Sequence, residues 1–400
     1  MRIGSFEFSL RELAGSMGDF GTLFPLAIGY IVVCDMNPAG FLVMMGLTNI
    51  ALGLIYKLPM PVQPKKVIAV MAIAQRWQPK LIYASGVGTG VVWLFLSLTG
   101  WIQKLANHTP KSVVRGIQIA LGVMLGWQGL KWIIGWQKLT VMSGEWIINI
   151  VLGVIAIVIV LTLRENKYAP AAIVLIVLGI AITAIKGELL KVFQVGFELP
   201  PITTFSFRDI YHAMILAGFA QLPLTATNAI IATAALIKEY WPEKPVSEKK
   251  LALNMGIINV IVTFFGGMPM CHGAGGLAGQ YYFGARTGGT NIIEGIIEIS
   301  LGLFFSQAIV GLFTAFPMSI IGAMLLMVGI ALVKYAFTLR VKDIIPAAVT
   351  AGISLIPKSN MAFGFAAGIF VYFAIKYYFR TIGNCKSCSS LFELTPDSKM

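Results

Sequence analysis

The sequence predicts an all-α polytopic membrane protein, and three observations support this. Of its 400 residues, 57% are hydrophobic and only 12% are charged, which is too apolar for a water-soluble globule. Apolar stretches of about 18–25 residues alternate with short charged clusters, and they are long enough to cross a hydrocarbon core as helices. Short motifs also recur in order along the chain, which divides fourteen apolar segments into two sets of seven.

The repeat rests on collinear motif pairs. The stretch 45–50 (MGLTNI) recurs at 255–260 (MGIINV), and the Met-Pro pair at 60–61 recurs at 268–269 with nearly the same spacing. Because each set has an odd number of segments, the second set enters the membrane from the opposite side. The sequence therefore predicts two inverted seven-segment repeats.

The expected boundaries follow from the apolar runs. The first repeat, with a short interfacial helix at its N-terminus, covers 1–186, the second covers 209–380, and a short cytoplasmic tail covers 381–400. With the N-terminus inside, alternate loops hold about 20 Lys and Arg on the cytoplasmic side and about 8 outside. Both termini are therefore predicted to be cytoplasmic, in the cell membrane if the organism is a prokaryote.

Composition and motifs also exclude several functions. The net charge of +13 does not indicate nucleic-acid binding, because the basic residues lie at segment ends and not on one soluble face. Cys385 and Cys388 form a lone C-x-x-C without a second pair of ligands, so no metal and no cofactor is predicted. No H-E-x-x-H or G-x-S-x-G motif occurs in a suitable context, so the chain is not expected to be an enzyme.

Two segments, 64–76 and 272–284, are too short to span a bilayer, and each follows a short extended Met-Pro element at the same place in its repeat. Prolines prevent helical hydrogen bonding before Pro64, whereas Pro64 itself suits the first turn of a helix. The starts of such half-helices have unpaired N–H groups and the positive end of the helix dipole. The sequence therefore predicts an anion site where two half-helix starts face each other near mid-membrane.

Substrate-binding residues are expected at both breaks. In the first break Pro64 begins the helix, Gln63 adds a neutral donor and Lys66 adds a cation, although Lys66 could equally point along the core or toward a lipid headgroup. The second break offers a run whose backbone can approach a ligand closely, namely Cys271, His272, Gly273, Ala274 and Gly275. A hydrogen-bonded core histidine is the alternative for His272. A helix-packing surface is the alternative for Gly275 with Gly279.

Other polar residues inside the apolar segments are candidates for further roles. Gln221 is expected to bind the substrate, and Asp19 and Asn228 to line its site, with interhelical hydrogen bonding as the alternative. Glu294 and Glu298 lie one turn apart on one face of the eleventh segment. They are candidates for proton coupling, with pairing to Arg286 or Lys66 as the alternative.

The two breaks resemble the signatures of a known family. The motif M-P-V-Q-P at 60–64 with Lys66, and the long motif from Met268 to Arg286, are similar to those of the molybdate transporter type-1 family, within the sulfate-permease (SulP) superfamily. The elements G-D-x-G-T at 18–22 and Q-L-P-L at 221–224 are also similar. The resemblance covers most of residues 10–335. Lys65 departs from it, because the family usually has an apolar residue there, and a change in anion preference is one possible consequence.

The resemblance implies fourteen segments divided into core and gate domains, without the regulatory STAS domain of typical sulfate permeases. It also implies secondary active transport of molybdate or a related tetrahedral oxyanion by an elevator-like movement. The expected partners are this anion, a proton as co-substrate, the lipid bilayer and a second copy of the chain in a homodimer. Sulfate transport and a channel-like anion conduit are the alternatives. A nucleobase permease is disfavoured, because Gln221 and His272 stand where that class would need carboxylates.

Overall fold

The computed structural model describes residues 1–135, 145–163, 171–189, 193–334, 337, 339–356 and 361–382. Cys385 and Cys388, and nearly all of the expected tail at 381–400, lie outside these residues. Within them, seven helices are long and apolar enough to cross a bilayer: Leu10–Val33, Pro38–Tyr56, Pro79–Thr99, Lys111–Ile134, Phe207–Tyr240, Gly289–Ala315 and Met361–Tyr378. Five more apolar helices are shorter: Lys66–Gln75, Trp146–Thr162, Ala171–Ile185, Met318–Val333 and Asp343–Leu355. With α14 (Glu248–Val262) and α15 (Ala274–Phe283) they make the fourteen predicted segments.

The first half starts with a small hairpin and contains seven segments. Its elements are β1 (Arg2–Ile3), β2 (Phe6–Glu7), α1 (Leu10–Ser16), η1 (Met17–Asp19), α2 (Phe20–Ile28), η2 (Gly29–Val33), α3 (Pro38–Tyr56), β3 (Gln63–Pro64), α4 (Lys66–Gln75), α5 (Pro79–Thr99), α6 (Ile102–His108), α7 (Lys111–Ile134), α8 (Glu145–Thr162) and α9 (Ala171–Ile185). The first four helical elements form one continuous span. The short α6 is an addition that the hydropathy pattern does not separate from α5.

The second half repeats this order. Its elements are α11 (Phe207–Ala213), η4 (Met214–Gly218), α12 (Phe219–Leu224), η5 (Thr225–Ile231), α13 (Ala232–Tyr240), α14, η6 (Thr263–Phe265), β4 (Met270–Cys271), α15, α16 (Gly289–Ala315), α17 (Met318–Val333), α18 (Val341–Leu355) and α19 (Met361–Ile382). Both first spans contain a proline inside a helix, Pro25 and Pro223, and wide π-type turns lie next to it. A proline lacks the N–H that a regular helix needs, which explains the local widening.

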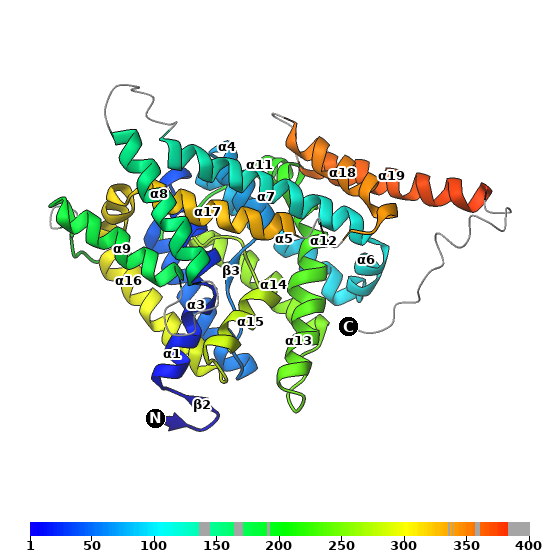
Figure 1. Ribbon diagram of the computed structural model, residues 1–400. Coiled ribbons are helices and arrows are strands. Elements are labelled where there is room, and N and C mark those ends of the chain that lie inside the picture. The colour runs from blue at the N-terminus through cyan, green and yellow to red at the C-terminus, as the bar shows by residue number, and fades with distance from the viewer. Residues whose placement is uncertain are drawn as a thin grey trace.

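The two halves pack through equivalent helices, as inverted repeats should. α3 lies along α16, and in the same way α14 lies along α5. A Cβ at Gly46 would lie 2.5 Å from the Gly295 carbonyl oxygen, and a Cβ at Gly90 would lie 3.0 Å from that of Gly256. Glycine is therefore needed for these close helix contacts. α7 and α17, the fifth segments of the two halves, lie side by side (Figure 1).

The helices form two groups. The core group contains the elements from α1 to α5 and from α11 to α16, and the gate group contains α7 to α9 and α17 to α19. Most helix pairs with extensive contacts belong to one group. In Figure 1, α8 and α9 lie at one side of the molecule and α18 and α19 at the other, with α7 and α17 between them.

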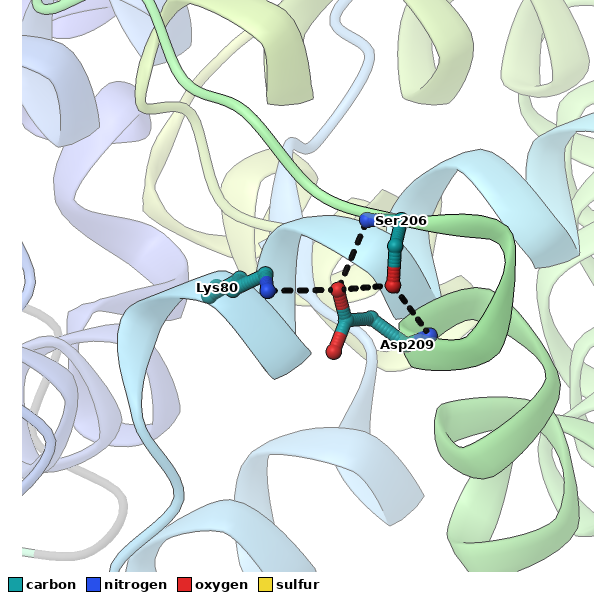
Figure 2. Close-up of polar contacts among 3 residues, drawn as sticks. All are labelled: Lys80, Ser206 and Asp209. Atoms are coloured by element: carbon teal, nitrogen blue, oxygen red, sulfur yellow. Dashed lines mark hydrogen bonds and ion pairs between the residues drawn. The ribbon is translucent and has the colours of Figure 1, made fainter.

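One ion pair joins the starts of α5 and α11, which come from different halves. Ser206 and Asp209 form a capping box: the Asp209 N–H donates to Ser206 Oγ at 3.2 Å, and the Ser206 N–H donates to Asp209 Oδ2 at 2.7 Å. Lys80 Nζ lies 2.8 Å from the same Asp209 oxygen (Figure 2). This contact lies apart from the two breaks. An exposed pair of this kind contributes little to stability, because solvent and salt screen it.

Candidate anion-binding site

The two Met-Pro elements meet as a pair of short antiparallel strands. Gln63 of β3 lies opposite Cys271 of β4, and the Lys65 N–H donates to the Pro269 carbonyl oxygen at 2.9 Å. The helices that follow, α4 and α15, begin directly after the strands at Lys66 and Ala274. The pairing therefore brings two half-helix starts together, in the arrangement that favours an anion.

An asparagine side chain holds the backbone before each half-helix in place. Asn291 of α16 accepts the Met60 N–H at 2.8 Å and donates to the Met60 carbonyl oxygen at 2.6 Å. Asn259 of α14 accepts the Met270 N–H at 2.8 Å and donates to its carbonyl oxygen at 2.7 Å. Each asparagine amide thus satisfies the N–H and the carbonyl oxygen of one residue, because helices and strands leave these two groups without a partner.

A cavity of about 790 Å³ opens beside the helix starts, between the core and gate groups. Among the predicted residues, those that line it are Asp19, Gln63, Lys66, Asn228 and Gly275. Its remaining polar lining includes Thr22, Gln118 and Lys334, and its apolar lining comes largely from α8, α9 and α17. The cavity therefore combines Asp19, Gln63 and Lys66 of the core group with a mostly apolar wall of the gate group, to which Gln118 and Lys334 add polar groups.

Several polar atoms of cavity-lining residues have no partner among the described residues. Gln63 Nε2 donates to Asp19 Oδ2 at 3.2 Å, whereas Gln63 Oε1 and Asp19 Oδ1 have no hydrogen-bond partner in the part of the chain that the structure describes. Within that part, Lys66 also forms no hydrogen bond or ion pair. Buried polar groups are normally satisfied, so the unpaired groups here suit a ligand or water.

The glycines of α15 have different surroundings. A Cβ at Gly275 would meet no atom within 4 Å, so this glycine faces open space at the cavity. A Cβ at Gly279 would lie 2.5 Å from the Gly18 carbonyl oxygen, and Cβ atoms at Gly273 and Gly276 would clash with the Gln63 amide. The packing alternative therefore applies to Gly279, while Gly273 and Gly276 leave room for Gln63.

Gln221 is hydrogen-bonded to protein groups beside the start of α4. It does not line the cavity: its Oε1 accepts the Val67 N–H at 2.8 Å, and its Nε2 donates to Thr225 Oγ1 at 2.9 Å. These bonds fit the alternative of interhelical hydrogen bonding, and contact of Gln221 with the substrate stays a prediction. Gln221 pairs with a backbone group in the first turn of α4, because that N–H has no partner within the helix.

The side chains at the second break face away from the cavity. His272 Nδ1 lies 3.3 Å from the Pro61 carbonyl oxygen, its ring meets Tyr56 edge-on, and its Nε2 has no partner among the described residues. Cys271 Sγ lies 3.8 Å from the Pro64 carbonyl oxygen. Pro64, Cys271 and His272 are all buried. At this break, which includes Ala274 at the first helical position, a ligand can therefore reach mainly backbone groups.

Glu294 and Glu298 lie on the buried face of α16, against α3. Glu298 Oε2 accepts from Asn49 Nδ2 at 2.8 Å, and Glu294 Oε2 has no partner among the described residues. Arg286 is not the partner of either carboxylate, because its guanidinium donates to the carbonyl oxygens of Tyr281 and Ala285 and stacks on the Tyr281 ring. The alternative of an ion pair with Arg286 is therefore wrong.

Sequence reasoning missed three polar lining residues and one buried cation. Gln118 and Thr22 look like ordinary polar residues of a span, and Lys334 looks like an ordinary residue of a span end. Lys65 was noted for its unusual identity. Its ammonium is fully buried and donates to Thr89 Oγ1 of α5 at 2.5 Å. Only the packing of α4 on α5 reveals that partner.

Comparisons with known proteins agree with this architecture. A family model described as "Molybdate transporter of MFS superfamily" matches residues 11–125 and 213–332. Molybdate transporter 1 of Arabidopsis thaliana is 30% identical over 421 residues, which cover 96% of this chain and 91% of that protein. Molybdate transporter 1 of Chlamydomonas reinhardtii is 26% identical, with 93% and 92% covered.

Solved structures show the same fold. The SLC26A9 structure matches with a TM-score of 0.69 at 15% identity, over 92% of this chain and 65% of that longer chain. The transmembrane domain of the cyanobacterial bicarbonate transporter BicA matches with a TM-score of 0.63 at 15% identity, over 92% and 96%. The match to the family model and the 30% identity to the plant protein establish the class: this chain is a multi-pass membrane protein that belongs to the molybdate transporter family.

Proposed function

We propose that the protein is a secondary active transporter of molybdate, which binds between the starts of α4 and α15. The observation that carries this proposal is the convergence of both helix starts, Gln63 and Lys66 on one cavity of about 790 Å³. A doubly charged oxyanion must exchange its hydration for donors that are already oriented. Backbone N–H groups at helix starts provide such donors without a buried counter-charge that would hold the ion too tightly.

In this proposal the residues have different tasks. Gln63 and Lys66 contact the anion with their side chains, and the residues from Gly273 to Gly275 do so with their backbone. Gln221 acts indirectly, since its bond to the Val67 N–H orients the first turn of α4. Asp19 and Asn228 line the path, and Asp19 accepts a hydrogen bond from Gln63 and so fixes the direction of that amide.

We also propose an elevator-like movement of the core group against the gate group. The cavity lies where these groups meet, and its two walls come from different groups. A displacement of the core group would carry both half-helix starts together, since β3 and β4 are hydrogen-bonded to each other. Rigid-body movement of one helix group against the other is common in transporters with inverted repeats.

Four further expectations complete the proposal. The repeats are bounded at 1–186 and 209–380. Both termini face the cytoplasm, in the cell membrane if the organism is a prokaryote. Glu294 and Glu298 bind a co-transported proton, and two copies of the chain form a homodimer.

Uptake by purified protein in liposomes tests the transport activity. Labelled molybdate should accumulate against its gradient with saturable kinetics, and unlabelled tungstate or molybdate should compete better than sulfate or uracil. Stronger competition by sulfate would favour sulfate transport, for which the 22% identity to the putative sulfate transporter YbaR of Bacillus subtilis is a weak indication. Flux that never saturates would indicate a channel-like conduit instead.

A further inference from the structure

Asn49 and Asn259 occupy the same position in the repeated motif but have different partners. Asn259 of the second half holds the backbone of Met270 directly. In the first half, Asn291 of α16 holds the backbone of Met60, and Asn49 donates instead to Glu298 Oε2 at 2.8 Å. The break of the first half is thus linked, through Asn291 and Asn49, to a carboxylate of the second half, whereas Asn259 alone holds Met270 at the other break.

These contacts form a continuous chain from α16 to the strand of the anion site. Glu298 accepts from Asn49, Asn49 Oδ1 accepts from Asn291 Nδ2 at 2.7 Å, and Asn291 binds both backbone groups of Met60. Glu298, Asn49 and Asn291 are all buried. Met60 lies three residues before Gln63, on the same extended segment.

The direction of each hydrogen bond in this chain is determined by the carboxylate. An ionised carboxylate can only accept, so Asn49 must present its NH₂ group to Glu298 and its oxygen to Asn291. Both N–H groups of Asn291 are then used, one for Asn49 and one for Met60. Protonation removes the charge that strengthens the first bond, and it adds an O–H that needs an acceptor of its own. The Asn49 amide is therefore held more firmly when Glu298 is ionised.

The surroundings of the two carboxylates contain few charges. Glu294 lies one turn from Glu298, and the charge of Asp19 acts on both. Of the elements packed on α16, β2 and α1 bring Glu7 and Glu12 to its first turn, and Arg11 lies against Gly284 before it. The elements α3, η2 and α9 also pack on α16, and within their described ranges they contain no charged residue. Two ionised carboxylates in such a place are costly, and a proton bound by the pair relieves this cost.

We propose that Asn49 and Asn291 are positioning residues that couple proton binding at the Glu294–Glu298 pair to the placement of the segment from Met60 to Gln63, and thereby of Gln63 at the anion site. This coupling rests on the proposed transport of molybdate with a proton. It gives Asn49 a task that differs from that of Asn259, the residue at the same position in the second repeat. Among the contacts that the structure describes, hydrogen bonds connect the carboxylate pair only to the break of the first repeat, at Met60.

Two measurements on the full-length protein test the coupling, and the first does not involve a substrate. Hydrogen exchange of the peptide covering 58–64, corrected for intrinsic rates, should depend on pH in the parent. This dependence should disappear in Glu298→Gln, which still accepts from Asn49 but cannot be protonated, and in Asn49→Leu, which breaks the chain. Asn259→Leu is the matched control, and it should retain the parental pH dependence at 58–64.

The second measurement uses liposomes and labelled molybdate. In Asn49→Leu, the ratio of pH-gradient-driven uptake to molybdate exchange at equal pH should fall about tenfold, which corresponds to about 1.4 kcal/mol of lost coupling. The double variant Asn49→Leu/Glu298→Gln should be no worse than either single variant. In Asn259→Leu both modes should fall together.

The outcomes separate this proposal from the transport function. If the parent binds and carries molybdate but Asn49→Leu and Glu298→Gln keep its pH dependence and its uptake ratio, the coupling is refuted and the function stands. If molybdate is not carried, the function fails, and the exchange measurement still decides the coupling. Should Asn49→Leu fail to fold, unchanged pH dependence in Glu298→Gln alone would refute it.

Discussion

The neighbouring lysines at the start of α4 show how strongly a single residue's role depends on its direction. Lys66 lines the cavity, whereas the Lys65 ammonium is buried on the other side of the helix against Thr89 of α5. Consecutive positions on a helix differ by about 100° in direction, so two adjacent identical side chains meet different environments. Lys66 is therefore a candidate for direct contact with the anion, and Lys65 contributes charge only from behind the helix start.

Gln63 should be the most sensitive side chain for anion binding. Removing one neutral hydrogen bond to a charged ligand costs about 1.5–3 kcal/mol, which is roughly a ten- to hundredfold loss of affinity. We expect this loss in Gln63→Ala, measured by equilibrium binding of molybdate to purified protein. Lys80→Ala, which removes the ion pair of Figure 2, is the control and should bind like the parent. Equal affinities in all three proteins would place the site elsewhere.

The Lys65–Thr89 contact predicts opposite effects for its two partners. Replacing a buried charge by an apolar side chain of similar length is often neutral or stabilising, so Lys65→Met should unfold at the parental temperature or above it. Thr89→Val leaves the ammonium without its acceptor and should cost about 1.5–3 kcal/mol. Thermal unfolding in detergent measures both. Strong destabilisation by Lys65→Met would show that the ammonium has a favourable partner beyond Thr89.

At the scale of single elements, α16 contains a break that the linker between the halves stabilises. Phe305 has non-helical backbone angles, and the N–H groups of Gly196 and Glu198 donate to the carbonyl oxygens of Phe304 and Leu303 at 3.0 and 2.9 Å. The Glu198 carboxylate accepts from Ser306 Oγ and Gln307 Nε2, at the point where the helix starts again. The linker thus satisfies backbone groups that the break releases, and it adds a negative charge at a helix start.

Glu198 should make stability depend on pH. Burial raises the pKa of Glu198, but hydrogen bonds from Ser306, Asn37 and Gln307 lower it by more, and the pKa lies below its ordinary value of 4.5. A lowered folded-state pKa gives stability that is present above 4.5 and is lost as the pH falls through the folded value. The unfolding temperature of the parent should therefore exceed that of Glu198→Gln at pH 7, and the difference should shrink as the pH falls below 4.5. A constant difference would contradict the assignment.

The glycines of α15 provide a matched pair on one helix. A methyl group at Gly279 would collide with the Gly18 carbonyl oxygen, whereas the space at Gly275 is open. Gly279→Ala should lower stability by about 1–3 kcal/mol through overpacking. Gly275→Ala should fold normally and weaken molybdate binding, because its methyl group enters the cavity. Normal binding and folding in both variants would remove α15 from the site.

For the whole molecule, the inverted arrangement predicts the side on which each loop is exposed. Single cysteines at Lys244 and Val195, in a chain with Cys385 and Cys388 replaced by serine, can be labelled with an impermeant maleimide. The native Cys34 and Cys271 are buried and should not react. Position 244 should react only from the cytoplasmic side and position 195 only from outside. The reverse pattern would invert the proposed topology, and labelling of both positions from one side would rule out an odd number of crossings between them.

The arrangement of groups also explains why sites from distant parts of the chain act together. Gln63 and Cys271, more than two hundred positions apart, face each other because each is the extended residue before a half-helix of its own repeat. The two-fold relation places equivalent elements around a common axis, so the anion site forms where the repeats meet.

Much of this architecture could be predicted from the sequence. The fourteen segments follow from apolar length, because a bilayer core accepts only helices or closed barrels. The two short segments follow from proline chemistry and the recurrence of Met-Pro. Gln63, Lys66 and Gly275 were assigned from the same elements, and the structure brings all three to one cavity.

What only the tertiary structure decided is the partner of each polar side chain. Gln221, Gln63 and Asn49 are all uncharged amides inside apolar segments, and nothing in their local sequence distinguishes a helix cap, a cavity donor and a link to a carboxylate. Those roles depend on which neighbouring helix supplies the matching donor or acceptor, at distances near 3 Å. The sequence determined where the helices begin and break, since that depends on local hydrophobicity and backbone chemistry. The packing of one repeat on the other decided which groups remain free to bind an anion.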